Sequence, residues 1–180
     1  MADQSTRSRM VLFPASAMLD VPVMSQPSLI PPVIDAFGAD HAGIALKDTL
    51  AAALREEGLA IDDLGTTGAA SVDYPDYAHR VAAAVADGTA QLGVLVCGTG
   101  IGMPIAANRH PAIRCAVVHD VTSARLSRAH GNANVLALGA RVIGPVVALD
   151  CLHAFLATGF DGGRHDARVA KLGMVGKAAA

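Results

Sequence analysis

The sequence predicts an α/β fold, a Rossmann-like three-layer α/β/α sandwich with a five-stranded, mostly parallel sheet. From residue 33 onward, short runs rich in Val, Ile and Leu alternate with longer segments of helical periodicity. Apolar residues make up 52% of the chain and aromatic residues 3%, and Trp is absent. The core must therefore be built from aliphatic side chains, as is usual where helices cover a parallel sheet. At 180 residues, the chain suits a single folded domain.

The first elements follow from apolar spacing and a glycine stop. The pattern predicts a strand over residues 33–37, a helix over 44–57 and a strand over 60–64. Ile44, Leu50 and Leu54 fall on one side of this helix. Gly58 is placed to end it.

The middle of the chain repeats the alternation. The pattern predicts a helix over 77–87, a strand over 92–96, a helix over 101–108 and a strand over 114–118. The loop 65–74 is rich in Gly, Thr and Ser, and Tyr74 with Pro75 introduces the helix that follows. Gly88 ends that helix, and Cys97 directly follows the next strand.

The last third completes the sheet. The pattern predicts a helix over 122–129, a strand over 134–138, a helix over 144–158 and a final helix over 164–173. Gly144 and Pro145 open the longer helix, and Gly162 with Gly163 breaks the chain before the final one.

The ends of the chain are expected to lie outside the domain. We expect a flexible N-terminal extension over 1–32, one domain over 33–175 and a C-terminal tail over 176–180. Arg7 and Arg9 before an apolar run weakly imitate a signal peptide. The run is short, contains Pro14 and lacks a small-residue cleavage site, which favours an extension.

Composition excludes several classes of function. The formal net charge is −2 with a pI near 6.3, and no basic run is interleaved with aromatic residues, so that binding of nucleic acid is not expected. No apolar stretch is long enough to predict a membrane span. Cys97, Cys115 and Cys151 have no metal-ligand spacing and favour a reducing, cytoplasmic compartment.

The junction after the central strand is the most informative feature. Cys97 ends an apolar run and is followed by a glycine-rich turn, Gly98 to Gly102, that leads into a helix. Backbone N–H groups at such a turn can hold an anion, and a helix N-terminus favours thiolate over thiol. A cysteine at a strand end is by itself more often a packing residue. The turn resembles a dinucleotide fingerprint, but Met103 stands where the third glycine belongs.

Polar residues follow several of the predicted strands. Asp40 and His41 follow the first, Cys97 and Thr99 the third, and Arg141 the last. The carboxyl ends of parallel strands meet at one edge of the sheet, and ligands bind in the crevice there. These residues are therefore expected to form one site. His119 and Asp120 also follow a strand, and the sequence assigns them no role.

Several motifs occur together in one order and carry a family resemblance. They are Phe37-Gly-Ala-Asp-His-Ala-Gly43, Asp73-Tyr-Pro75, Cys97-Gly-Thr-Gly-Ile-Gly102, Ser127-Arg-Ala-His130, Asn134-Val-Leu-Ala-Leu-Gly139, Arg141 and Gly162-Gly-Arg-His165. Over residues 33–175 the chain resembles the type B ribose-5-phosphate isomerase family of sugar-phosphate isomerases. The N-terminal extension has no counterpart in that family.

The resemblance implies an aldose–ketose isomerase that needs no metal and no organic cofactor. Cys97 resembles the base that moves a proton between C1 and C2 through a cis-enediol(ate). Thr99 and the backbone amides of the turn resemble the groups that stabilise the oxyanion. These amides belong to Gly98, Gly100, Ile101 and Gly102. His130 resembles the acid–base histidine that opens the sugar ring. We expect His130 to lie at the same sheet edge as Cys97 and Asp40.

The resemblance also implies substrate contacts and an assembly. Asp40, His41 and Tyr74 resemble residues that contact the sugar. Three arginines resemble phosphate ligands, namely Arg141, Arg164 and Arg168; the last two are spaced i, i+4 on the predicted final helix. Family members are at least homodimers that build each site from both subunits. This chain is therefore expected to form a homodimer or a dimer of dimers, in which C-terminal arginines would serve a neighbour's Cys97.

One departure from the family pattern leaves the substrate open. The family commonly has Asn directly after the histidine that matches His130, whereas this chain has Gly131 and then Asn132. The main hypothesis is that the protein interconverts ribose 5-phosphate and ribulose 5-phosphate in the pentose phosphate pathway. The alternatives are another phosphosugar, such as a tetrose phosphate, allose 6-phosphate or galactose 6-phosphate, and a non-catalytic phosphosugar-binding protein.

Overall fold

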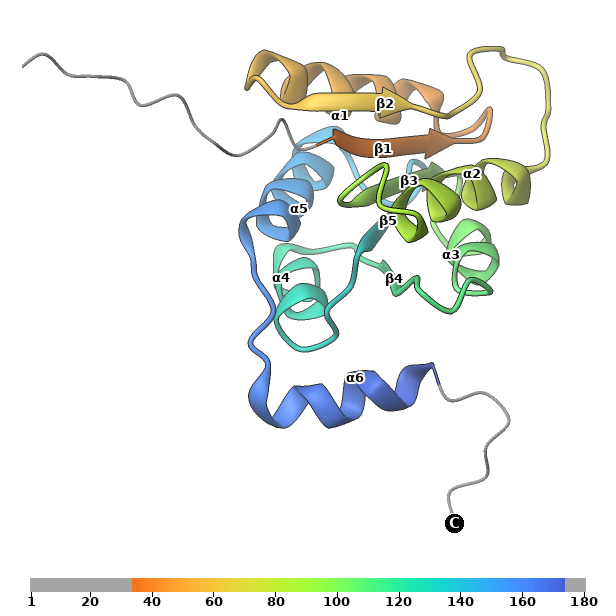
Figure 1. Cartoon of the computed structure of the whole chain (residues 1–180). Helices are drawn as coiled ribbons and strands as arrows, with labels where there is room; N and C mark the ends of the chain where they lie inside the picture. Colours follow the sequence, from red (N-terminus) through yellow and green to blue (C-terminus); the bar gives the residue numbers. More distant parts are fainter. Residues whose placement is uncertain (1–33, 174–180) are drawn as a thin grey trace, which may run out of the picture.

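A computed structural model describes residues 34–173, so that the predicted extension and tail lie outside the described part. The described chain forms a five-stranded sheet in the order β2-β1-β3-β5-β4 (Figure 1). The strands are β1 (Ile34–Ala39), β2 (Ala60–Asp63), β3 (Gly93–Cys97), β4 (Cys115–Val117) and β5 (Val135–Gly139). All four strand pairings are parallel, which confirms the predicted α/β fold.

Helices cover both faces of the sheet. They are α1 (Ile44–Glu56), α2 (Tyr74–Ala86), α3 (Gly102–Ala107), α4 (Val121–Ala129), α5 (Pro145–Ala157) and α6 (Asp166–Leu172), with a 3₁₀ turn η1 (Gly163–His165). One apolar core joins α1, α4 and α5 to the sheet and includes Phe37 and Leu136. The other joins α2 and α3 to the opposite face and includes Val81 and Leu95. Side chains alternate between these two cores along each strand.

Two predicted helix starts are wrong. The helix expected from residue 77 begins at Tyr74, because extended Asp73 precedes it and Pro75 fits the first turn of a helix. The final helix expected over 164–173 is split: Gly162 and Gly163 adopt φ values of 62° and 58°, a 3₁₀ turn follows, and the α-helical part is α6. Arg164 and Arg168 therefore do not share one α-helix.

The short helix α6 lies apart from the sandwich. Figure 1 shows it beyond α4, away from the β2 side of the sheet. None of its residues is buried, and Leu172 is 63% exposed. In the described part of the chain, no helix is long and apolar enough to cross a membrane.

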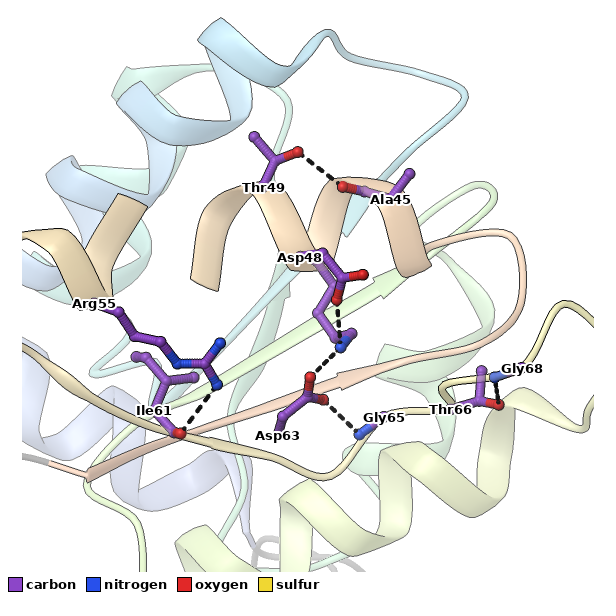
Figure 2. Close-up of polar contacts among 10 residues, drawn as sticks. Ala45, Asp48, Thr49, Arg55, Ile61, Asp63, Gly65, Thr66 and Gly68 are labelled. Atoms are coloured by element: carbon purple, nitrogen blue, oxygen red, sulfur yellow. Dashed lines mark hydrogen bonds and ion pairs between the residues drawn. The ribbon is translucent and has the colours of Figure 1, made fainter. Parts of the chain in front are cut away.

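A buried lysine anchors the loop that leads to Tyr74. Lys47 of α1 is 1% exposed and forms ion pairs with Asp63, at the end of β2, and with Asp48 (Figure 2). Asp63 also accepts a hydrogen bond from the backbone N–H of Gly65, 3.0 Å away. Burial by itself lowers the pKa of Lys47, but its bonds and charge interactions with Asp48 and Asp63 outweigh it and raise the pKa. The pairing thus holds the start of the 65–73 loop against α1.

A buried carboxyl group in β1 has few partners. Asp35 is fully buried, and its Oδ1 accepts the backbone N–H of Leu92 at 3.2 Å. Its Oδ2 has no hydrogen-bond partner among the described residues. Burial raises the pKa of Asp35 from 3.8 to about 6, although the Leu92 bond and the charge of Arg128 act in the opposite direction. At neutral pH, a charge is therefore held in the core.

The folded protein is expected to lose stability between pH 4 and pH 7 because of Asp35. The pKa of Asp35 is higher in the folded than in the unfolded protein. The stabilisation of the fold by the neutral carboxyl group is therefore complete below pH 3.8 and is lost as the pH rises through about 6. The shift corresponds to about 3 kcal/mol at neutral pH. Asp35→Asn, which keeps an acceptor for Leu92, should therefore raise the free energy of unfolding at pH 7 but not at pH 4.

Urea unfolding at a fixed protein concentration measures this effect. Asp62→Asn is the matched control, because Asp62 is an exposed residue of the neighbouring strand. If Asp35→Asn and the unmodified protein show the same dependence of unfolding free energy on pH, Asp35 does not titrate as described.

Candidate active site

The predicted residues at the strand ends do meet at one edge of the sheet. Cys97 is the last residue of β3, and its Cα is paired with that of Gly139 at the end of β5. Asp40 follows β1, whose last residue Ala39 is paired with Val96. Arg141 follows β5, and its guanidinium lies over Gly98. Three adjacent parallel strands thus deliver a thiol, a carboxylate and a guanidinium to the same place.

The Cys97 turn is shaped around the sulfur. Cys97 is 4% exposed, and its Sγ accepts a hydrogen bond from the backbone N–H of Gly100 at 3.2 Å. Gly100 has φ +75°, and a Cβ there would lie 2.8 Å from the backbone N of Gly139. The turn therefore requires glycine at this position. The backbone N–H of Gly100 is thus aimed directly at the sulfur.

Residues of the surrounding loops border this turn. Asp40 is 7% exposed, and its Oδ1 accepts the backbone N–H groups of Ala42 and Gly43, which leaves the second carboxylate oxygen for other contacts. His41 accepts the N–H of Val72 on Nδ1, so that its neutral form carries the proton on Nε2. The ring of Tyr74, at the start of α2, lies against Gly102.

Thr99 and Ile101 complete the turn. Thr99 is exposed, and its Oγ1 accepts the N–H of Ile101 at 3.3 Å. Helix α3 is six residues long, shorter than the expected 101–108, because the chain leaves helical geometry at Asn108. The backbone amides nearest the sulfur therefore belong to the turn and not to a long helix.

His130 does not lie at this edge, which corrects the prediction. It follows α4, and α4 runs back from the end of β4 toward the start of β5. The next residues lie at the amino ends of the strands: the backbone carbonyl of Asn134 accepts the N–H of Gly93, the first residue of β3. Cys97 is the last residue of the same strand. The length of this five-residue strand, about 13 Å, therefore separates the amino edge near His130 from the carboxyl edge at Cys97.

A second cluster forms around His130 at the amino edge. Its imidazole is stacked on that of His165, with ring centroids 4.3 Å apart and planes 6° apart. Its Nε2 lies 3.9 Å from a carboxylate oxygen of Asp161, and Arg164 donates from Nε to Nε2 of His165 at 3.2 Å. Arg168 lies on α6 in the same region. In the sequence, His165 stands out only as part of the Gly162–His165 motif and Asp161 gives no signal, because their proximity to His130 depends on how η1 folds back.

The loop after His130 has little room for a side chain at Gly131. A Cβ there would lie 2.8 Å from the carbonyl oxygen of Ser127. Asn132 adopts φ 46°, a left-handed conformation that Asn tolerates better than most residues. Its carbonyl accepts a hydrogen bond from Arg114. An asparagine in place of Gly131 would therefore need a shift of this turn.

Asp120 has a local structural role. Its carboxylate accepts the backbone N–H of Ser123 at 2.8 Å and caps the N-terminus of α4. Hydrogen bonds from Ser123 lower the pKa of Asp120. The capping accounts for this residue without any part in the site.

Comparison with known proteins decides the family. A family model described as Ribose/Galactose Isomerase matches residues 36–172. The chain belongs to the ribose/galactose isomerase family. The residues around Cys97 and those around His130 both lie within the matched range.

Relatives in the ribose/galactose isomerase family cover most of the domain. Ribose-5-phosphate isomerase B of Escherichia coli is 47% identical over 134 residues, which is 74% of this chain and 90% of that protein. D-erythrulose-4-phosphate isomerase of Pectobacterium atrosepticum is 46% identical over 140 residues, 77% of this chain and 91% of that protein. The solved ribose-5-phosphate isomerase B of Clostridium thermocellum superposes with a TM-score of 0.77 at 47% identity, covering 78% of this chain and 95% of that one.

Proposed function

We propose that this isomerase interconverts ribose 5-phosphate and ribulose 5-phosphate by proton transfer, in the cytoplasm. The observation that carries the proposal is the Cys97 turn, where a buried sulfur accepts the backbone N–H of Gly100 at the end of the central strand. An aldose and its ketose differ by the position of one proton on carbon and one on oxygen. A single base next to fixed N–H donors is sufficient for this exchange.

The chemistry follows from the turn. The Cys97 thiolate takes the proton from C2 of the aldose, and the electrons of the broken C–H bond form an enediolate. The amides of residues 98–102, with Thr99, stabilise its negative oxygen. The thiol then returns the proton to C1, and a proton moves between the two oxygens, which leaves the ketose. Asp40 and His41 bind the sugar hydroxyls, and Tyr74 lines the sugar-binding site.

The site is completed by a second copy of the chain, in a homodimer or a dimer of dimers. The separation of His130 from Cys97 within one chain supports this, because one sugar cannot contact both sheet edges. Ile101 of the Cys97 turn and Ile105 of the following helix α3 are 56% and 59% exposed, and Leu172 on α6 is similarly exposed. Large apolar side chains at both clusters are typical of a protein interface. A hollow of about 670 Å³ separates α6 from the region around Ile113.

In the assembled site, each chain supplies one part. Arg141 comes with Cys97, while Arg164, Arg168 and His130 come from the neighbouring chain. The guanidinium groups hold the phosphate of the substrate by paired hydrogen bonds. His130 exchanges a proton with the ring oxygen and the C1 hydroxyl to open the furanose. The nearby Asp161 stabilises the imidazolium that forms.

A tetrose phosphate is the second candidate substrate. Gly131 removes the side chain that follows the ring-opening histidine in the family, and a relative at 46% identity is named for D-erythrulose 4-phosphate. A tetrose 4-phosphate cannot close a furanose ring, since its C4 oxygen carries the phosphate. Such a substrate would need Cys97 but not His130.

Ribose 5-phosphate is expected to give the highest kcat/KM in a panel of aldose phosphates. The panel contains erythrose 4-phosphate, ribose 5-phosphate, allose 6-phosphate and galactose 6-phosphate, each assayed for ketose formation. We expect a preference of about tenfold or more, the discrimination that one mismatched carbon unit commonly gives. A higher value for erythrose 4-phosphate would replace the main proposal by the second. Asn132→Ala, assayed in parallel, tests whether Asn132 replaces the missing side chain at Gly131.

A further inference from the structure

His165 is a buried histidine next to the proposed ring-opening residue. It ends η1 and is 6% exposed, whereas the side chain of His130 is 42% exposed. Its ring is parallel to that of His130, with centroids 4.3 Å apart. A buried flat ring against a half-exposed one restricts the tilt of the exposed ring.

The hydrogen bond from Arg164 defines the protonation of His165. Arg164 donates from Nε to Nε2 of His165 at 3.2 Å. Since a guanidinium can only donate, Nε2 must carry a lone pair, and the ring is neutral with its proton on Nδ1. Four charged or titratable groups surround it, from the residue after α4, the loop after α5, η1 and α6: His130, Asp161, Arg164 and Arg168. Burial lowers the pKa of His165, and the positive neighbours lower it further, while Asp161 raises it.

We propose that His165 is a positioning residue that connects the phosphate-binding arginine Arg164 to the ring-opening histidine His130. One face of its imidazole supports the His130 ring, and its Nε2 fixes the guanidinium of Arg164. The spacing between the phosphate and the sugar ring oxygen is thereby held constant. Because His165 remains neutral, His130 can take up a proton without a second positive ring in contact. The inference rests on the proposed function.

Two substitutions separate the two contacts. His165→Phe keeps a flat ring under His130 but cannot accept from Arg164. It should raise KM for ribose 5-phosphate by about tenfold, the loss expected for one hydrogen bond to a charged group, with kcat nearly unchanged. His165→Gln keeps an acceptor but removes the stacked ring. It should lower kcat by about tenfold or more through misplacement of His130 and shift the pH profile of kcat, with KM nearly unchanged.

The controls separate this inference from structural damage. His153→Gln is the matched control, because His153 is a half-exposed histidine of α5 that pairs with Glu57. It should change neither constant. The inference is overturned if His165→Phe and His165→Gln alter KM and kcat in the same proportion, or if both behave like the control.

A measurement on the unmodified protein tests the geometry without any assay. Nitrogen-detected NMR of the imidazoles at neutral pH should show His165 neutral, with the proton on Nδ1. A proton on Nε2, or a positively charged His165 ring, would refute the inference even if variants do not fold. If ribose 5-phosphate is not a substrate but the NMR result holds, the proposed function fails and the geometry stands.

Discussion

Replacement of Cys97 by alanine should reduce isomerase turnover by about a thousandfold or more, within the range for loss of a general base. The sulfur is the group placed at the amide turn, and no other base is proposed to reach C1 and C2 there. The turn is held by backbone contacts and not by the sulfur alone, so the fold should survive. Initial rates of ketose formation measure the loss, and calorimetric binding of a substrate analogue shows whether the crevice is intact.

Two further cysteine variants make this result specific. Cys151→Ala removes an equally buried thiol from α5, within the core and away from the crevice, and should leave kcat unchanged. Cys97→Ser keeps the size of the side chain with a far weaker acid and should be as impaired as the alanine variant. Wild-type turnover in Cys97→Ala would remove Cys97 from the role of base.

Mixing two inactive variants should restore activity if the site is shared between chains. Cys97→Ala and His130→Ala each damage every site in their own homodimers. In a mixed dimer, one site combines an intact Cys97 with an intact His130, and the other site has neither. After dissociation and random reassociation, about one quarter of wild-type activity is therefore expected, since half of the dimers are mixed and each has one intact site. Steady-state rates against the mixing ratio measure the recovery.

The matched control mixes two variants of the same edge. Cys97→Ala with Arg141→Ala cannot produce a complete site in any pairing, so the mixture should be no more active than the mean of its parents. If the Cys97→Ala and His130→Ala mixture also shows no recovery although mixed dimers form, the two residues do not act in one shared site.

Much of the fold could be predicted from residue patterns alone. Alternating apolar runs and amphipathic segments are local properties, and they identified the strands and most of the helices, with errors at the ends. The predicted start of α2 is three residues too late, because Pro75 is typical of the loop before a helix and also fits the first turn of one. The division of the last segment into η1 and α6 depends on the φ angles of Gly162 and Gly163, which residue type allows but does not impose.

The candidate site was predictable only in part. By itself, the sequence determined the parallel sheet, the glycine-rich junction at Cys97 and the gathering of Asp40 and Arg141 beside it, because strand direction places the ends of parallel strands together. Only the tertiary structure decided that His130 lies at the opposite edge, stacked on His165 and near Asp161. Which edge a loop occupies depends on the direction of the helix before it, and the stacking of His130 on His165 joins residues far apart in the chain. That physical separation supports the proposed sharing of the site between two chains.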